Sequence, residues 1–326
     1  MKTAGRAEAN RPGGASEIFV TTSDQADRRL DRVLRTRYPD VPLGAIMKAM
    51  RCGAVRVNGA RAEGSLRLAA GDEVFAPWPA AERPTALRGA DGSHSVGYPE
   101  DGEPLLRTIL RTDDIWCVDK PAGLLSQPDR PGGDSVVTRA WRELSWRRED
   151  FRPATAGRLD RNVSGVMLIA LNAPILRTFS ELVREGLIKK IYRAVVLGQP
   201  PSEGEISLPL LKDERANKAS SGKDGRSALT RFRTLEPGRD FSLVELELVT
   251  GRPHQARFHM SSIGCPIAGD FKYGDRRPEK ARGRLLLHAY SISLPDTPIL
   301  PPNLRGRVII AEMPKKFTKA ELSPEA

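Results

Sequence analysis

The stretch GRLDRNVSGVMLIALN, residues 157–172, decides how the rest of the chain is interpreted. It begins with a charged Arg-Leu-Asp, passes through Ser164-Gly165 and ends in an almost entirely apolar run. Near-continuous hydrophobicity of this kind indicates a strand with both faces covered. A loop on such a rigid support can hold Asp160 at the mouth of a cleft, where functional residues are common. An isolated Arg-Leu-Asp is more often a plain surface turn, so the neighbouring segments have to decide between the two.

Strand and helix patterns fill the region from residue 105 to 314 around this stretch. Apolar or alternating runs predict strands at 115–120, 166–172, 189–198, 241–251 and 285–294. Helical patterns at 174–186 and 252–264 each end at a glycine, which is a common helix stop signal. A region of about 200 residues can bury a sizeable core.

Residues 16–78 form a smaller predicted unit. Two helical patterns come first, and their apolar stripes are Leu30, Val33 and Leu34, then Ile46, Met47 and Met50. Alternating valines then lead into Asn58-Gly59, a dipeptide preferred in two-residue hairpin turns. LAAGDEVFAP predicts a further turn and strand. Basic residues occur throughout the unit, at Arg28, Arg29, Arg32, Lys48, Arg51, Arg56, Arg61 and Arg67.

Low-complexity composition marks the remaining segments. Residues 79–104 are rich in Pro, Gly, Ser and charge and lack apolar periodicity, so they are predicted to be a linker. Residues 1–15 lack the apolar core of a signal peptide and are expected to be a disordered tail, although their arginines also permit a transit peptide. Residues 315–326 are expected to be a loosely ordered C-terminal tail.

Composition limits the class of protein. The 326 residues carry a net charge of +11 and contain no apolar stretch that approaches the ~20 residues of a membrane span. A basic chain suits a polyanionic partner such as RNA, but charge alone does not separate that case from an ordinary basic protein. The three cysteines, Cys52, Cys117 and Cys265, are sparse and form no CxxC pair. This pattern favours a reducing cytosol over a disulfide framework or a zinc ribbon.

Five segments in order resemble the RluA family of pseudouridine synthases. They are VDKPAGLLSQP (118–128), GRLDRNVSG (157–165), KKIYRAVVLG (189–198), TGRPHQARFHMSSIGCPIAGDFKYG (250–274) and LLLHAYSISLP (285–295). Residues 16–78, from RLDRVL through VRVNG to LAAGDEV, resemble the S4 RNA-binding domain. The layout is similar to RluC- and RluD-type synthases of large-subunit ribosomal RNA. The implied fold is α/β (α+β), with an S4-like module ahead of a catalytic domain built on a mixed, largely antiparallel sheet.

The resemblance implies a catalytic role for three residues. Asp160 matches the family's catalytic aspartate, which either attacks the ribose C1′ or abstracts the C2′ proton. Arg257 matches the arginine that pairs with this carboxylate, and a guanidinium can hold it both charged and oriented. Tyr192 matches the active-site tyrosine, whose ring would stack on the uracil and whose hydroxyl could take part in proton transfer.

Further residues are implied in RNA binding. Arg158 matches the arginine that helps to hold the flipped nucleotide, which must leave the helix because its glycosidic bond is otherwise inaccessible. Arg252, His254 and Gln255 are expected to bind substrate. The S4-like unit is expected to contact folded RNA mainly by shape and phosphate contacts, through Arg28, Arg29, Arg32, Lys48, Arg51 and Arg56.

The sequence departs from the family pattern at four positions. Gly157 and Val163 stand where the family usually has His and Thr, and Pro253 and Ala256 stand where it has Thr and Ile. The related RsuA group often has Gly-Arg-Leu-Asp. The departures leave the proposed chemistry intact but leave the subgroup, and hence the RNA site, open.

Other kinds of site are less well supported. His254 and His259 lie five apart, which aligns two metal ligands poorly on a helix, so hydrogen-bonded structural roles are expected and no metal. Glu245 and Glu247 could pair with Asp160 as in a glycosidase, but their alternation in a strand predicts that they face solvent. Ser164-Gly165 lacks the nucleophile-elbow spacing of a hydrolase. GDFKYG (269–274) lacks the spacing of a phosphate loop, and Cys117 and Cys265 are expected to be core residues.

The sequence therefore predicts a cytoplasmic RNA pseudouridine synthase that acts, by resemblance, on 23S-type ribosomal RNA or an assembling large subunit. We expect a monomer that needs no cofactor and has no membrane partner. The main alternative is a non-catalytic RNA-binding ribosome-assembly factor that has kept the synthase fold. An enzyme of free nucleotides is a weaker alternative, because it would not need the S4-like unit.

Overall fold

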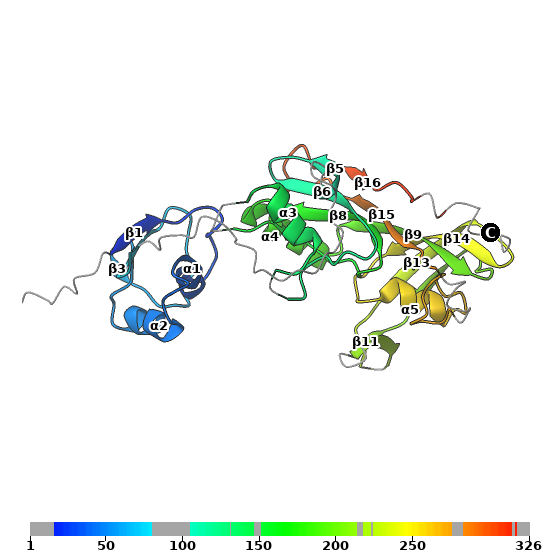
Figure 1. Cartoon of the computed structure of the whole chain (residues 1–326), viewed down its shortest axis with the longest axis horizontal. Coiled ribbons are helices and arrows are strands. Elements are labelled where there is room, and N and C mark those ends of the chain that lie inside the picture. Colours follow the sequence, from blue (N-terminus) through cyan, green and yellow to red (C-terminus); the bar gives the residue numbers. More distant parts are fainter. Residues whose placement is uncertain are drawn as a thin grey trace, which may run out of the picture. The chain divides into compact units, whose positions relative to one another are not determined.

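The computed structural model describes residues 16–79, 105–130, 132–146, 151–213, 218–222, 224–275, 283–314 and 317. The predicted tails and the predicted linker lie outside these residues, apart from Pro79 and Phe317. The chain divides into two compact units, the first consisting mainly of residues 1–89 and the second of most of the remainder (Figure 1).

The first unit combines a small sheet with two helices. Its elements are β1 (Glu17–Val20), α1 (Leu30–Arg37), α2 (Leu43–Arg51), β2 (Arg56–Val57), β3 (Ala60–Arg61) and β4 (Glu73–Ala76). The strands pair antiparallel in the order β1-β4-β2-β3. Asn58 and Gly59 have φ values of 50° and 77°, which is the left-handed conformation that a tight hairpin turn requires at both positions. The predicted helix pair and hairpin are therefore present.

The core of the first unit corrects one predicted side chain. Leu30, Val33 and Leu34 of α1 are buried as expected, and so are Ile46 and Met50 of α2. Met47, predicted to belong to the second apolar stripe, is 39% exposed, and Ala49 is buried in its place. Ala49 completes the i, i+3, i+4 spacing from position 46, whereas position 47 is turned by about 100° from that face.

One large sheet organises the second unit. Its strands are β5 (Arg107–Arg111), β6 (Ile115–Lys120), β7 (Ala154–Thr155), β8 (Ser164–Ala170), β9 (Lys189–Leu197), β10 (Glu203–Ser207), β13 (Leu229–Glu236), β14 (Phe241–Leu248), β15 (Leu287–Ser293) and β16 (Val308–Ile310). The main order is β10-β13-β14-β9-β15-β8-β6-β5, with β16 beside β15 and β7 beside β8. Of these pairings, β8–β15 is parallel and the others are antiparallel. The predicted mixed, largely antiparallel sheet is confirmed.

Gly165 is required where the parallel pair meets. It pairs with Ala289 of β15 and has a φ of 117°. A Cβ atom at this position would lie 2.2 Å from the Ala289 carbonyl oxygen, so any larger residue would push the two strands apart.

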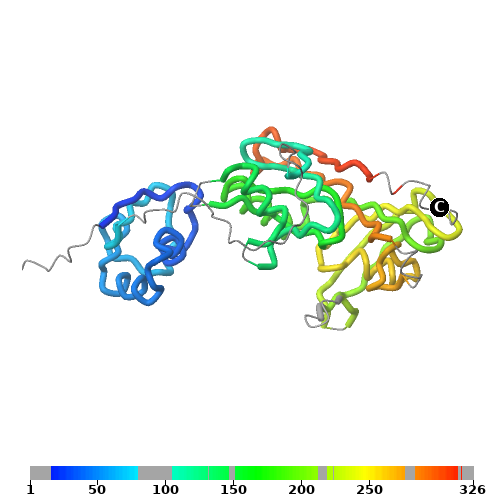
Figure 2. Tube along the Cα trace, in the orientation of Figure 1, coloured from blue at the N-terminus to red at the C-terminus, as the bar shows by residue number. Residues whose placement is uncertain are grey.

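Helices cover both faces of β6 and β8, which explains why residues 164–170 are buried along their whole length. Ile115 and Cys117 pack with Phe179 of α4 (Ala173–Arg184), and the alternate residues Trp116 and Val118 pack with Val136 of α3 (Val136–Glu143). The predicted glycine stop after α4 is confirmed, since Gly186 has a φ of 72°. The Cα trace shows the C-terminal strand β16 running beside β5 (Figure 2).

The third helix and a separate hairpin lie beyond this central part. Helix α5 (Gln255–Ser262) packs Met260 against the sheet residues Val244 and Leu287. Strands β11 (Leu210–Asp213) and β12 (Lys218–Ser221) form a separate two-stranded sheet, Leu210 also bridges Arg226, and β12 contacts α5. Figure 1 shows this hairpin on the same side of the unit as α5.

Candidate active site

Asp160 lies in the loop between β7 and β8, on the support that the sequence predicts. The hydroxyl of Ser126 accepts a hydrogen bond from the Leu159 N–H at 3.0 Å and donates one to the Leu159 carbonyl at 2.7 Å. The Gly123 N–H donates to the Arg161 carbonyl at 2.8 Å. The loop is therefore fastened on both sides of Asp160, whose side chain remains 30% exposed.

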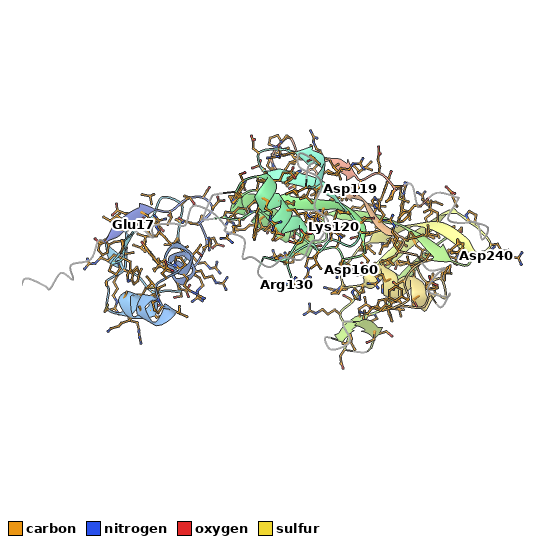
Figure 3. The ribbon with its side chains drawn as sticks, in the orientation of Figure 1. Glu17, Asp119, Lys120, Arg130, Asp160 and Asp240 are labelled. Carbon is orange, nitrogen blue, oxygen red and sulfur yellow. The ribbon has the colours of Figure 1, made fainter. Side chains whose placement is uncertain are left out.

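Lys120, which was not predicted as a site residue, anchors the same loop from the interior of the protein. It is fully buried, and its ammonium donates to the carbonyls of Pro121, Leu124 and Arg161 at 3.0, 2.7 and 3.0 Å. Burial lowers the pKa of Lys120 to about 8, against the opposing effect of the Asp160 charge. Figure 3 shows the labelled Lys120 and Asp160 close together in the middle of the second unit. The lysine joins the turn at residues 121–124 to the loop that carries Asp160.

Arg257 holds the Asp160 carboxylate, as predicted from the resemblance. Its Nη1 donates to Asp160 Oδ2 at 3.0 Å, and its Nε and Nη2 donate to the two oxygens of Asp270 at 2.7 and 2.9 Å. Burial alone would lower the pKa of Arg257. The hydrogen bonds and charges of Asp270 and Asp160 outweigh this effect, so the pKa lies above its ordinary value. The guanidinium is therefore a fixed cation. Its Nε and Nη2 edge binds Asp270, and its Nη1 binds Asp160.

Asp270 is a site residue that the sequence interpretation missed. Its side chain is 1% exposed, and it belongs to the GDFKYG segment at the end of the fourth family-like stretch, where no role was predicted for it. The preceding Gly269 has a φ of 77°, and a Cβ there would lie 2.1 Å from the Arg284 carbonyl oxygen. A Gly-Asp pair close after a predicted arginine was the available signal, since only glycine allows this close approach.

Tyr192 lies in β9, between β14 and β15, at the boundary of two hydrophobic clusters. Burial raises its pKa above the ordinary value, and the negative charge of Asp160 raises it further. The hydroxyl therefore stays protonated at neutral pH. A neutral phenol on a rigid strand, within the electrostatic reach of Asp160, suits both stacking and hydrogen bonding to a base.

The predicted substrate-binding residues differ in their placement. His254 Nε2 lies 3.6 Å from Asp160 Oδ2, and Arg158 is exposed two residues before Asp160. Arg252 is half-buried and donates its Nε to the Ser227 carbonyl at 3.0 Å. These three residues remain candidates for RNA contact.

Gln255 has a structural role instead. It is 1% exposed, its Oε1 accepts from Thr250 Oγ1 and the Arg252 N–H, and its Nε2 donates to the Leu229 carbonyl and Thr230 Oγ1. All of its hydrogen-bonding groups are thus engaged within the protein, which leaves none for substrate. The expectation that Gln255 binds substrate is corrected on this ground.

The basic residues predicted for the first unit lie mostly on its surface. Arg29, Arg32, Lys48, Arg51 and Arg56 are exposed, and Arg28 is half-buried and donates to Thr36 Oγ1 at 3.3 Å. Arg29 forms an ion pair with Asp31 at 2.9 Å. Arg32, Lys48 and Arg51 lie on the two helices, as the predicted RNA-binding surface requires.

The residues weighed for other chemistry have local partners. His259 is buried and hydrogen-bonded to Thr230 Oγ1 and the Leu208 carbonyl, and Cys117 and Cys265 are buried. Glu245 and Glu247 are partly exposed, alternate with the buried Val244 and Leu246, and form ion pairs with the exposed Arg233 and Lys189. In the described part of the chain, no group of three or more His, Cys, Asp or Glu is placed to hold a metal ion. No described helix has both the length and the apolar character needed to cross a membrane.

Comparison with known proteins agrees with this geometry. The family model described as RNA pseudouridylate synthase matches residues 114–262, which include Asp160, Tyr192 and Arg257. Ribosomal large subunit pseudouridine synthase C of Rickettsia bellii is 34% identical over 295 residues, which cover 85% of this chain and 93% of that protein. The chain belongs to the RNA pseudouridylate synthase family. The recognition made from five sequence segments is confirmed.

Other members of the family give the same result. The synthase of the same name from Vibrio parahaemolyticus is 33% identical, and the match covers 91% of this chain and 92% of that protein. The one from Escherichia coli is 34% identical, and the match covers 85% of this chain and 88% of that protein. The structure of human RNA pseudouridylate synthase domain containing 4 superposes with a TM-score of 0.53 at 25% identity, over 65% of this chain and 90% of that protein. As a pseudouridine synthase, the chain is an isomerase that converts uridine to pseudouridine in RNA.

Proposed function

We propose that this synthase modifies uridines of 23S-type ribosomal RNA in the large subunit, with Asp160 as its catalytic carboxylate. The observation that carries the proposal is the arrangement Asp160–Arg257–Asp270, in which a buried carboxylate fixes the guanidinium that orients an accessible one. The names of the relatives, which specify the ribosomal large subunit, support this choice of RNA.

The chemistry that we propose needs an ionised, oriented carboxylate and no external reactant. Asp160 attacks the ribose C1′ or removes the C2′ proton, and either route breaks the bond between C1′ and the uracil N1. The uracil turns and C5 bonds to C1′, which releases Asp160 from C1′ in the first route and is accompanied by return of the proton to C2′ in the second. The C5 proton leaves and N1 gains a proton, so the atoms balance in an isomerisation. Tyr192 stacks on the uracil while it turns, and its protonated hydroxyl serves the proton transfers.

RNA binding is assigned to both units. The exposed Arg158, together with Arg252 and His254, would hold the flipped nucleotide and offset the few kcal/mol that unstacking costs. The first unit would act as an S4-like module that binds phosphates of folded RNA through the basic residues on α1, α2 and the hairpin. Gln255 contributes by shaping the turn that presents Arg252.

The setting in the cell is part of the proposal. A cytoplasmic monomer suits an enzyme of ribosomal RNA, and the three cysteines are unpaired thiols, two of them buried. RNA is the partner that the family supports. The enzyme recognises either free ribosomal RNA or an assembling large subunit.

Tritium release tests the activity and the carboxylate together. Large-subunit RNA transcripts labelled at uridine C5 are incubated with wild type and with Asp160→Asn, and small-subunit transcripts serve as the control RNA. Release from large-subunit RNA by wild type alone is expected. Release by neither protein from transcripts or assembling subunits, with tight binding by both, would instead support the non-catalytic assembly factor.

A further inference from the structure

A chain of hydrogen bonds links the β11–β12 hairpin to the active site. The Ala219 N–H of β12 donates to the Tyr273 hydroxyl oxygen at 2.6 Å, and this hydroxyl lies 2.7 Å from His254 Nδ1. The other ring nitrogen of His254 lies 3.6 Å from Asp160 Oδ2. Side chains from distant parts of the sequence therefore connect the hairpin backbone to the carboxylate.

The donors and acceptors assign the protons along this chain. The Tyr273 oxygen accepts from Ala219, and the arrangement in which its own proton goes to His254 Nδ1 leaves that nitrogen unprotonated. Burial lowers the pKa of His254, and Arg257 and Lys272 oppose its protonation as well, while Asp160 and Asp270 favour it. A neutral imidazole with its proton on Nε2 satisfies these contacts. That N–H faces the Asp160 oxygen which already accepts from Arg257.

Tyr273 packs against both strands of the hairpin. Tyr273 is 5% exposed and clusters with Leu210 of β11 and Ala219 of β12. The ring of Phe258 on α5 meets it edge-on, with centroids 6.1 Å apart and an interplanar angle of 82°. The Arg257 guanidinium lies 5.0 Å from the Tyr273 ring centroid. A displacement of the hairpin therefore moves the hydroxyl that orients His254.

The backbone at His254 supports the same interpretation. His254 immediately precedes α5 and has a φ of 56°, a left-handed conformation that is uncommon for residues other than glycine. Residues held in such conformations are concentrated at functional sites. This conformation places the ring between Tyr273 and Asp160, three residues before Arg257.

We propose that Tyr273 and His254 are positioning residues that couple the seating of the β11–β12 hairpin to the placement of the Asp160 carboxylate. The inference rests on the proposed function and adds to it a dependence of turnover on the hairpin. With the hairpin seated, Asp160 faces two donors, Arg257 Nη1 and His254 Nε2. With the hairpin displaced, the Tyr273 hydroxyl loses the Ala219 N–H that fixes its orientation, and His254 is held less firmly beside Asp160.

The first test measures the tautomer of His254 without RNA. The chain has four histidines, so long-range ¹H–¹⁵N spectra are simple, and the His254 signals are identified by their loss in His254→Gln. Wild type is expected to show the Nε2–H tautomer at pH 8, and Tyr273→Phe a mixture of tautomers. Tyr290→Phe is the matched control. It also removes a tyrosine hydroxyl, but the Tyr290 ring packs against Arg193, whereas the hydroxyl at His254 is that of Tyr273. An Nδ1–H tautomer in wild type would overturn the proposal even if Tyr273→Phe failed to fold.

The second test separates turnover from binding. Tyr273→Phe should lower kcat on the order of tenfold to a hundredfold, as misplacement of a catalytic group does, with unchanged RNA affinity. His254→Gln, whose amide can lie near Asp160 as Nε2 does, should retain more kcat than His254→Asn, whose side chain is shorter. An unchanged kcat in Tyr273→Phe, with wild type active, would refute the coupling. An inactive wild type with the expected tautomer would count against the proposed function alone.

Discussion

Arg257→Met is expected to destabilise the second unit strongly, because it leaves a buried carboxylate without its charged partner. The Asp270 side chain is 1% exposed and accepts two hydrogen bonds from Arg257, at 2.7 and 2.9 Å. Removal of one partner from a buried ion pair typically costs about 3–5 kcal/mol in the free energy of unfolding. Asp160→Asn should cost about 1 kcal/mol or less, because Asp160 is 30% exposed and Arg257 keeps Asp270.

Urea unfolding followed by tryptophan fluorescence measures these differences. Trp116, Trp141 and Trp146 belong to the second unit, so a Trp78→Phe background restricts the signal to that unit. Neutralising the stranded carboxylate in Arg257→Met/Asp270→Asn should recover about 1–3 kcal/mol, the usual size of coupling between residues in contact. A cost below about 1 kcal/mol for Arg257→Met, or no recovery in the double variant, would refute the buried ion pair.

Three further predictions concern the site and the first unit. Tyr192→Phe should fold and bind RNA but lose turnover, and full activity in a single-turnover assay would leave the ring with a stacking role only. Folded Lys120 has a pKa of about 8 against an ordinary 10.5, so the unfolded chain binds more protons between these values and stability rises with pH there. The rise should amount to about 3 kcal/mol and be missing in Lys120→Met, and parallel pH profiles of urea unfolding would contradict it. Replacing the exposed Arg32, Lys48 and Arg51 by alanine should lower the slope of log affinity against log salt by roughly 2 to 3, and an unchanged slope in filter binding would argue against the S4-like interpretation.

Periodicity and turn chemistry carried most of the fold. The apolar run at 166–172 predicted a strand covered on both faces, and the strand lies at 164–170. Asn58-Gly59 and Gly186 predicted a hairpin and a helix end through conformations that few other residues adopt. Met47 was misplaced because neighbouring apolar residues in a short helix leave its exact face ambiguous.

Only part of the site could be predicted from the sequence. Asp160 and Arg257 meet across 97 residues, a contact suggested by resemblance and not by any local pattern. Asp270, Lys120 and Tyr273 escaped notice because their importance comes from burial and from partners supplied by the tertiary fold. Gln255 shows the opposite case: its polar side chain in a functional motif is fully used inside the protein.

Sequencing of pseudouridines in cells tests the central claim most directly. Large-subunit RNA from a strain that lacks this protein is treated with a carbodiimide, and reverse-transcription stops are compared after complementation with wild type or Asp160→Asn. The account predicts specific stops that disappear in the deletion, return with wild type and do not return with Asp160→Asn. If every stop in large-subunit RNA persisted in the deletion strain, or if Asp160→Asn restored the stops that wild type restores, the account would be contradicted.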